Sequence, residues 1–120
     1  MRRLFSGIVG LTMLLTGCAT PSLENKSRLD LIKQRNELIC GVSGKIPGFS
    51  FLERDGSYQG LDVDICKAFA AAIIGNSDKI QYRPLTAAER FTAIKTGEID
   101  LLSRNTTLTL SRDSSGGNGL

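Results

Sequence analysis

The sequence predicts an α/β fold with a parallel-type sheet and flanking helices. Short apolar runs that end at Gly or Pro alternate with longer segments whose apolar residues recur at helical spacing. The resulting order is strand, hairpin, helix, strand, helix, strand, and strands separated by helices form parallel sheets through right-handed crossovers. The 120 residues, 41% of them hydrophobic, suffice for one small globular domain.

The first 18 residues are typical of an export signal. Two arginines precede an apolar stretch over residues 8–15, which is too short to span a bilayer as a permanent helix. The stretch leads into Leu-Thr-Gly-Cys, which resembles the lipobox of bacterial lipoproteins, whose Cys is acylated and becomes the new N-terminus. We therefore expect residues 1–17 to be a lipoprotein signal peptide and Cys18 to carry a lipid. A plain secretory signal cut near Ala19 is the alternative, and either signal exports the protein.

Residues 18–35 are predicted to tether the membrane to a folded domain that begins near Asn36. The first part of this segment is polar and contains a Pro. A short helix is expected over residues 29–37, with Leu29 and Ile32 on one side.

Charge and composition argue against several classes of function. The chain has 15 basic and 12 acidic residues, and removal of the signal's two arginines leaves 13 against 12, a net charge of +1. Nucleic-acid binding normally requires a clustered basic face, so none is expected. The sequence contains no His, which excludes His-based catalysis and His metal ligation. We expect no metal and no cofactor.

The first half of the domain is predicted to form a strand and a hairpin. Residues 38–42 are a compact apolar run that reads as a strand, and a loop over residues 43–48 follows its carboxyl end. An Asp-Gly pair between two alternating segments then predicts a hairpin turn. Phe49 and Phe51 share one face of the extended segment. We expect them in the core, with cover over a ligand as the alternative.

A helix is predicted to run from about residue 60 to residue 74 and to end at Gly75. Its apolar residues give it a broad buried side: Val63, Ile65, Cys66, Ala68, Phe69, Ala70, Ala72 and Ile73. Asp62 suits the N-cap, and Asp64 in the first turn complements the helix dipole. Metal binding or acid–base chemistry by these two carboxylates is the alternative.

The second half of the domain repeats the strand–helix pattern. Residues 79–83 alternate and predict a second strand, residues 87–95 a helix, and residues 98–102 a third strand. Thr86 followed three residues later by Glu89 is typical of a capping box.

The polar segment after the third strand is the candidate binding site. It offers backbone N–H groups, amides and hydroxyls, and Arg112 lies seven residues after Asn105 and five after Thr107. A planar guanidinium beside such donors can hold both oxygens of a carboxylate. Ligands of open α/β sheets usually bind at the carboxyl ends of strands. The alternative is a surface turn with an exposed Arg.

Four motifs, in order and with matching spacing, resemble the solute-binding proteins (family 3) of polar amino-acid ABC transporters, and most closely the general L-amino-acid binding branch. They are Gly-Leu-Asp-Val-Asp at 60–64, Pro-Leu-Thr-Ala-Ala-Glu-Arg-Phe at 84–91, Gly-Glu-Ile-Asp-Leu-Leu-Ser-Arg-Asn-Thr-Thr at 97–107 and Ser-Arg-Asp at 111–113. The resemblance covers residues 38–120. It implies a type II periplasmic-binding-protein fold of two α/β lobes, of which residues 36–120 are a partial N-terminal lobe with the second lobe absent.

The resemblance also implies ligand-binding residues. Arg112 matches the arginine that grips the ligand's α-carboxylate, and Arg90 matches one that reaches the side chain of acidic ligands. Ala87 lies where relatives carry a larger contact residue. The complete implied set is Arg112, Thr107, Asn105, Arg90, Ala87, Ser43 and Phe49.

The implied function is binding of an L-amino acid in the periplasm for delivery to the permease subunits of an ABC importer, from a lipid anchor. Ligand affinity in this family depends on closure of two lobes, which removes water, so this chain is expected to bind weakly or not at all. The alternatives are a lobe of a related enzyme, either a cyclohexadienyl dehydratase or a lytic transglycosylase fusion, and a lobe of a sensor receptor. No nucleophile–base pair is evident, so we expect no enzyme.

Two cysteines remain once Cys18 is lipidated. An even pair in an oxidising compartment permits a disulfide between Cys40 and Cys66, and buried free thiols are the alternative. An isolated lobe would expose a sheet edge and apolar surface, so marginal stability is expected.

Overall fold

The computed structural model describes residues 26–107 and 109–111 of the chain. The signal peptide, Cys18 and Arg112 lie outside the described residues, so the predictions that concern them stay predictions. Within the described part, no helix is long and apolar enough to cross a membrane.

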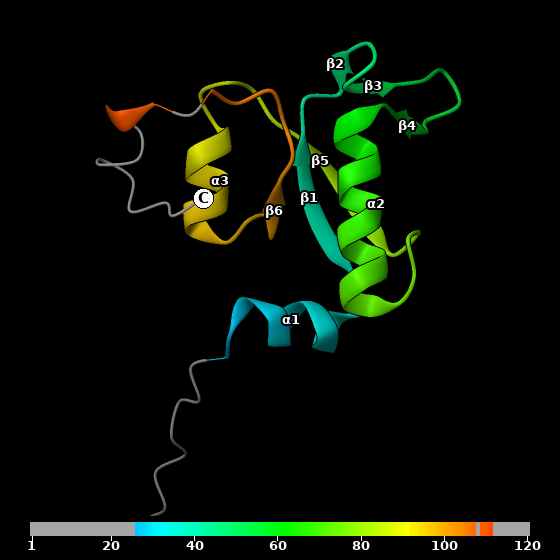
Figure 1. Cartoon of the computed structure of the whole chain (residues 1–120), viewed down its shortest axis with the longest axis vertical. Helices are drawn as coiled ribbons and strands as arrows, with labels where there is room; N and C mark the ends of the chain where they lie inside the picture. The colour runs from blue at the N-terminus through cyan, green and yellow to red at the C-terminus, as the bar shows by residue number, and fades with distance from the viewer. Residues whose placement is uncertain (1–25, 108, 112–120) are drawn as a thin grey trace, which may run out of the picture.

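The main sheet consists of three parallel strands in the order β5-β1-β6, which confirms the predicted parallel arrangement. They are β1 (Leu38–Val42), β5 (Ile80–Pro84) and β6 (Leu101–Leu102). Because the strands are parallel, their carboxyl ends meet at one edge, which is the upper edge in Figure 1.

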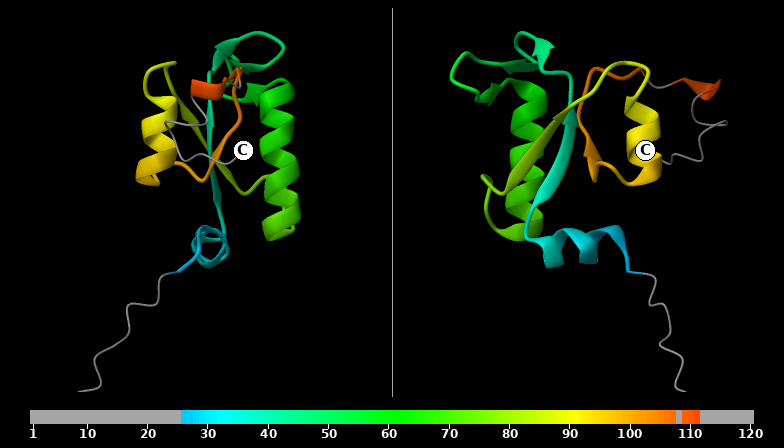
Figure 2. Two further views of the ribbon diagram at one scale, coloured as in Figure 1. Left: turned by 60° about the vertical axis from the view of Figure 1, so that its left-hand side comes forward. Right: turned by 180° about the vertical axis from the view of Figure 1, so that it is seen from behind.

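One helix covers each face of this sheet (Figure 2). On one face, α2 (Leu61–Ile74) packs Cys66 against Cys40 and Val42 of β1. On the other face, α3 (Arg90–Thr96) contributes Ala93 to a second apolar cluster.

Gly41 lets the α3 side of the sheet pack closely. A Cβ atom at this position would lie 2.6 Å from Cδ1 of Ile99 and 2.9 Å from Cδ1 of Leu85. Both of these residues are buried, so a larger residue would have to displace packed side chains. Close packing against Ile99 and Leu85 therefore explains why a glycine lies inside the predicted strand.

The helix α1 (Arg28–Arg35) is part of the packed domain, which corrects the expected tether boundary. Ser27 caps it through a capping box with Asp30. Ile32 is buried and packs with Leu38 and Ala70. The domain thus begins well before Asn36, because burial of Ile32 holds the helix against the rest of the fold. Leu29, expected beside Ile32, is 45% exposed.

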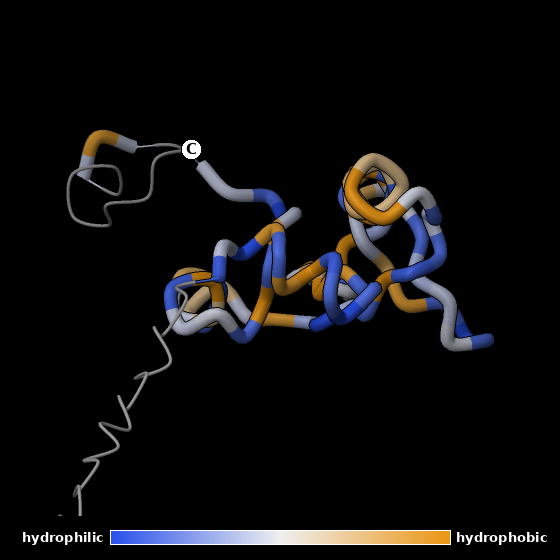
Figure 3. Tube along the Cα trace, turned by 90° about the horizontal axis from the view of Figure 1, so that it is seen from below, coloured by the Kyte–Doolittle hydropathy of each residue, from blue (hydrophilic) through white to orange (hydrophobic). Residues whose placement is uncertain are grey.

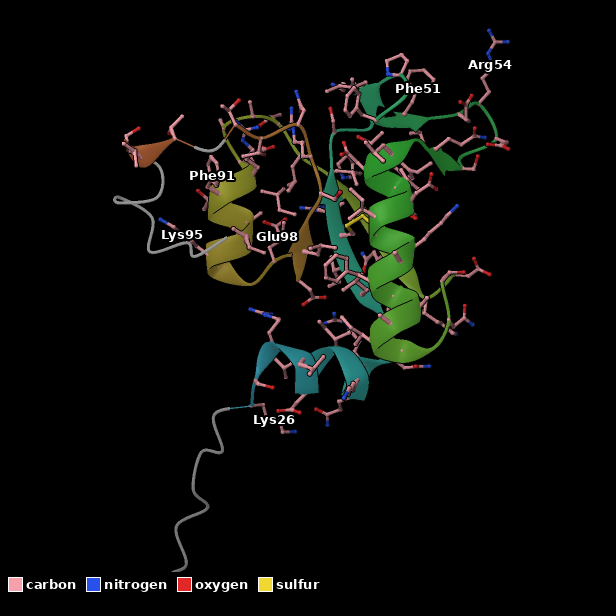
Figure 4. The ribbon with its side chains drawn as sticks, in the orientation of Figure 1. Lys26, Phe51, Arg54, Phe91, Lys95 and Glu98 are labelled. Carbon is pink, nitrogen blue, oxygen red and sulfur yellow. A yellow bond between two sulfur atoms is a disulfide. The ribbon has the colours of Figure 1, made fainter. Side chains whose placement is uncertain are left out.

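The predicted hairpin is confirmed as β3 (Ser50–Leu52) and β4 (Tyr58–Gln59), and the loop before it contains β2 (Lys45–Ile46). The three form a separate antiparallel sheet in the order β2-β3-β4. The core prediction for the two phenylalanines is wrong, since Phe49 is 43% and Phe51 37% exposed. Ser50 between them is the residue that faces inward, and it is fully buried. Figure 4 shows Phe51 on the outer side of the hairpin.

The start of α2 differs from the prediction. Its N-cap is Gly60, with φ of 122°, rather than Asp62. The amides of Leu61 and Asp62 donate to the carbonyl oxygens of Gly48 (3.0 Å) and Phe49 (2.8 Å). Backbone carbonyls therefore satisfy the first-turn donors, and Asp62 lies inside the first turn instead of capping it. Asp64 lies in that turn as predicted, and Gly75 ends the helix as predicted.

The third strand and second helix are shorter than predicted. β6 has two residues because the Asp100 carboxylate, not a main-chain carbonyl, accepts the hydrogen bond of the Ile39 amide (2.8 Å). α3 begins at Arg90 rather than Ala87. The capping-box contacts nevertheless form, and the Thr86 amide donates to the Glu89 carboxylate (2.9 Å).

The helix α2 is apolar around most of its circumference, as its orange and tan coil in Figure 3 shows. Val63, Cys66 and Ala70 are buried. Leu61, Ile65 and Phe69 lie on the opposite stripe and are 56%, 39% and 46% exposed. The predicted buried side of this helix is thus too wide, because Ile65, Ala68, Phe69 and Ala72 are exposed.

Candidate functional site

The candidate site lies at the carboxyl edge of the parallel sheet, where three segments come together (Figure 1). They are the loop after β1, the turn after β5 and the segment after β6. Main-chain hydrogen bonds join them: Leu85 N donates to Val42 O, and Ser103 N donates to Gly41 O, both at 2.9 Å. The edge is therefore built from residues that are far apart in the chain.

Arg90 organises the segment after β6. The residue is buried, with 8% exposure, and its Nη1 group donates to the carbonyl oxygen of Asn105 (3.2 Å) and to the hydroxyl of Thr106 (3.4 Å). Its guanidinium carbon lies 5.1 Å from the ring centroid of Phe91, within range of a cation–π contact. The structure thus brings Arg90 and Asn105 together, as a binding edge requires.

The other predicted residues after β5 and β6 are open to solvent. Asn105, Thr107 and Ala87 are all exposed. The side-chain oxygen of Asn105 accepts a hydrogen bond from Nε of Arg104 at 3.4 Å. The exposed polar groups of Asn105 and Thr107 are accessible to a small anionic ligand.

A buried polar cluster supports the loop after β1, and the sequence analysis missed it. Ser50 Oγ accepts hydrogen bonds from the amides of Ser43 (3.0 Å) and Gly44 (3.2 Å). The same hydroxyl lies 3.5 Å from Oδ2 of Asp62. The available signal was the Phe-Ser-Phe pattern, because alternation along a strand turns a serine inward when its neighbours point outward.

The electrostatics of Asp62 reflect this burial. Removal from water raises the pKa of the Asp62 carboxyl above its usual value, while the hydrogen bond from Ser50 and the positive charge of Arg104 act in the opposite direction. Arg104 is held at this edge because it donates to the carbonyl oxygen of Leu85.

Phe49, the remaining predicted residue, lies on the hairpin side of the edge and is exposed. An open hollow of about 340 Å³ lies beside it and is lined by Pro47, Gly48, Phe51, Glu53, Gln59 and Gly60. All of these belong to the hairpin or its ends, so the hollow is not formed by the strand-end residues around Arg90.

A disulfide joins Cys40 of β1 to Cys66 of α2, with 6.2 Å between their Cα atoms (Figure 4). The sequence alone did not decide between this disulfide and two buried free thiols. The bond ties the central strand to the helix whose first turn carries Asp62. Among the described residues, no group of three or more His, Cys, Asp or Glu side chains could hold a metal ion.

Comparison with known proteins identifies a family. Residues 38–115 match the model of the bacterial extracellular solute-binding proteins, family 3. The glutamate/glutamine/aspartate/asparagine-binding protein BztA of Rhodobacter capsulatus is 47% identical over 109 residues, which are 91% of this chain and 31% of BztA. The general L-amino acid-binding periplasmic protein AapJ of Rhizobium johnstonii is 41% identical over 111 residues, 92% of this chain and 32% of AapJ.

A solved structure is also similar. It is an ABC transporter periplasmic binding protein from Brucella ovis with glutathione bound, with a TM-score of 0.74 and 46% identity. The match covers 77% of this chain and 29% of that one. The chain thus spans about a third of the length of the relatives it matches.

Proposed function

The chain belongs to the bacterial extracellular solute-binding proteins, family 3, and we propose that it binds an amino acid outside the cytoplasm for delivery to an ABC importer. The family implies a periplasmic location. Similarity to BztA and AapJ, both named for amino-acid binding, supports the class of ligand.

The observation that carries the proposal is the hydrogen bond from buried Arg90 to the main chain of Asn105. It orders an exposed polar segment at the carboxyl ends of parallel strands, where ligands of such sheets bind. In the proposed site, Asn105 and Thr107 bind the α-carboxylate together with Arg112. Arg90 reaches the side chain of an acidic ligand, and Ala87, Ser43 and Phe49 line the cleft.

The first ligands to test follow from the relatives. The name of BztA specifies glutamate, glutamine, aspartate and asparagine, and the Brucella ovis protein holds glutathione. Glutathione contains a glutamyl residue with a free α-amino and α-carboxylate group. We therefore propose a ligand with the amino-acid end of glutamate, and the size of the group beyond it is what the experiment must decide.

A role in binding rather than catalysis accounts for the buried carboxylates. Asp100 is ion-paired with Arg35 and Arg28, and Asp62 is hydrogen-bonded to Ser50. The arginines neutralise Asp100, and the Ser50 hydroxyl beside Asp62 is fully buried, so a substrate could not reach it. The relatives compared above are solute-binding proteins, which supports a non-enzymatic function over the dehydratase and transglycosylase alternatives.

Attachment to the membrane through lipidated Cys18 is a second part of the proposal. It rests on the Leu-Thr-Gly-Cys sequence after an apolar segment. Mass spectrometry of the membrane fraction should find acyl chains on Cys18, and Cys18→Ser should release the protein from the membrane. A soluble parent protein would contradict the anchor.

Ligand binding is tested by titrating the 120-residue chain with candidate ligands while the backbone amide shifts are recorded by NMR. L-glutamate, L-glutamine and glutathione should each be added, with γ-aminobutyrate as the control that lacks the α-carboxylate. These residues supply contacts from one sheet edge, so we expect dissociation constants in the millimolar range, about −4 kcal/mol. Amide shifts at Asn105 and Thr107 support the site. Equal responses to γ-aminobutyrate, or shifts elsewhere only, contradict it.

A further inference from the structure

Ser50 is a fully buried hydroxyl whose hydrogen-bonding capacity is completely used. Its Oγ atom accepts from the Ser43 amide at 3.0 Å and the Gly44 amide at 3.2 Å. A hydroxyl oxygen has two lone pairs and one proton. Both lone pairs are therefore occupied, and the proton is directed to the remaining neighbour, Oδ2 of Asp62 at 3.5 Å. The orientation of the hydroxyl is thus set from both sides.

The two amides that Ser50 holds begin the loop after β1. Ser43 immediately follows the strand, and Gly44 adopts a φ of 72°, which a residue with a side chain rarely adopts. The chain therefore turns at this point away from the strand direction. Without Ser50, the two amides would have to find other partners in a buried position, which costs stability.

Asp62 connects this loop to the start of α2. Its carboxylate faces Ser50, and its own amide donates to the carbonyl oxygen of Phe49 at 2.8 Å. Gly60 allows the close approach, because a Cβ there would collide with the Phe49 carbonyl. One residue thus controls both ends of the loop, at Ser43 through Ser50 and at Phe49 directly.

We propose that Ser50, oriented by Asp62, is a positioning residue that fixes the loop from Ser43 to Phe49 at the ligand-binding edge. The proposal rests on the proposed function, because a fixed loop holds the exposed Phe49, and Ser43, which is itself buried, at the ligand-binding edge. Ser50 itself is buried and does not touch the ligand. It acts through the two amides that it holds.

The test is hydrogen exchange of backbone amides, measured by NMR on the full 120-residue chain without ligand. Ser50→Ala removes the acceptor, and the exchange rates of Ser43 and Gly44 should rise at least about fivefold, the loss expected for a net hydrogen bond. Ser57→Ala is the matched control. It breaks another serine–aspartate pair on the same hairpin, in which Ser57 Oγ lies 2.7 Å from Asp55 Oδ1, and should leave both rates unchanged.

Substitutions at Asp62 keep the proposal falsifiable if Ser50→Ala fails to fold. Asp62→Leu removes the acceptor that orients the hydroxyl, whereas Asp62→Asn retains an acceptor oxygen of the same shape. We expect faster exchange at Ser43 and Gly44 in Asp62→Leu and rates near those of the parent in Asp62→Asn. Equal rates in the two variants, or unchanged rates in a folded Ser50→Ala, would overturn the proposal.

Titration with L-glutamate then separates this inference from the proposed function. In a binding parent, Ser50→Ala should weaken L-glutamate binding about fivefold or more, and Ser57→Ala should not. A Ser50→Ala variant with fast loop exchange and unchanged affinity overturns the positioning role. A parent that binds no probe contradicts the predicted millimolar affinity, and the exchange rates still decide whether Ser50 fixes the loop.

Discussion

Two buried aspartates, at opposite ends of the same sheet, are held in different ways. Asp100 lies at the amino end, where its fully buried carboxylate is ion-paired with Arg35 and, at 3.6 Å, with Arg28 of α1. Asp62 lies at the carboxyl end, where its hydrogen-bond partner is the neutral hydroxyl of Ser50. Asp100 thus combines two charged partners with one main-chain amide, that of Ile39, whereas at the end proposed to face the ligand a neutral hydroxyl accepts from two consecutive amides.

The two kinds of contact constrain the backbone at the two ends of the sheet to different degrees. A charge pair with partly exposed arginines holds two elements together without defining every backbone atom between them. A hydroxyl that accepts from two consecutive amides defines the backbone itself. A ligand contacts backbone groups and side chains directly, so geometric definition matters most at the carboxyl end.

The largest expected effect comes from the disulfide that ties β1, which runs between the two ends, to α2. Replacing Cys40 and Cys66 together by Ala removes a disulfide with a sequence separation of 26 residues, which should lower the free energy of unfolding by about 3–4 kcal/mol. Urea unfolding with and without a reducing agent measures this. The reducing agent should destabilise the parent but not the variant, and amide exchange in the variant should rise at both ends of the sheet. A loss confined to one end would show that the bond does not couple them.

Asp100→Ala should have the next largest effect and should act on the amino end. It leaves the Ile39 amide without its acceptor and breaks the contacts to α1, for an expected loss of about 2–3 kcal/mol, discounted because both arginines are partly exposed. Urea unfolding gives the loss, and amide exchange shows where it occurs. Asp100→Asn keeps an acceptor for Ile39 and should lose less. Similar losses in both variants would assign the stabilisation to charge alone.

Arg90→Lys tests the carboxyl end and should cost about 1 kcal/mol. A lysine ammonium cannot reproduce the planar contacts to Asn105 O and Thr106 Oγ1. Unfolding experiments give the stability change, and amide shifts should concentrate at these two residues. Arg54→Lys is the control, because Arg54 lies exposed at the tip of the hairpin (Figure 4). Shifts spread over the whole sheet would contradict a local role for Arg90.

The smallest expected effect is a pH dependence of stability that comes from Asp62. Burial raises the pKa of Asp62 in the folded state above 3.8, so the folded protein binds this proton more tightly than the unfolded chain. Its contribution is fully present below pH 3.8 and is lost as the pH rises through the raised pKa. The stability of the parent relative to Asp62→Asn should therefore fall with rising pH, as measured by urea unfolding at several pH values. A relative stability that increases with pH would contradict the sign.

Local patterns were sufficient for most of the secondary structure. The apolar run at Leu38–Val42 forms the predicted strand, and the Asp-Gly pair lies in the predicted hairpin turn. Gly75 and Gly97 end the two helices with positive φ, as expected for C-terminal caps. These features depend on neighbours in the chain, which a sequence displays directly.

Predictions failed where a partner far along the chain decided the outcome. Asp62 was expected to cap α2, but the carbonyls of Gly48 and Phe49, from before the hairpin, accept the first-turn amides, and the carboxylate contacts Ser50 instead. Arg35 and Arg28 of α1 precede Asp100 by 65 and 72 residues, so they meet it only once the sheet has assembled, and α1 therefore joins the domain. Phe49 and Phe51 look like core residues until the hairpin places Ser50 inward between them.

The sequence by itself determined the order of the main strands and helices and their parallel arrangement, and it indicated the sheet edge at which we propose that a ligand binds. Alternation, helical spacing and end signals act over a few residues, and the crossover rule converts their order into topology. Only the tertiary structure decided which polar groups became buried, which cysteines joined and which aspartate received a charged partner. Those outcomes depend on which side chains share a space from which water is excluded, and that space does not exist until distant segments have packed together.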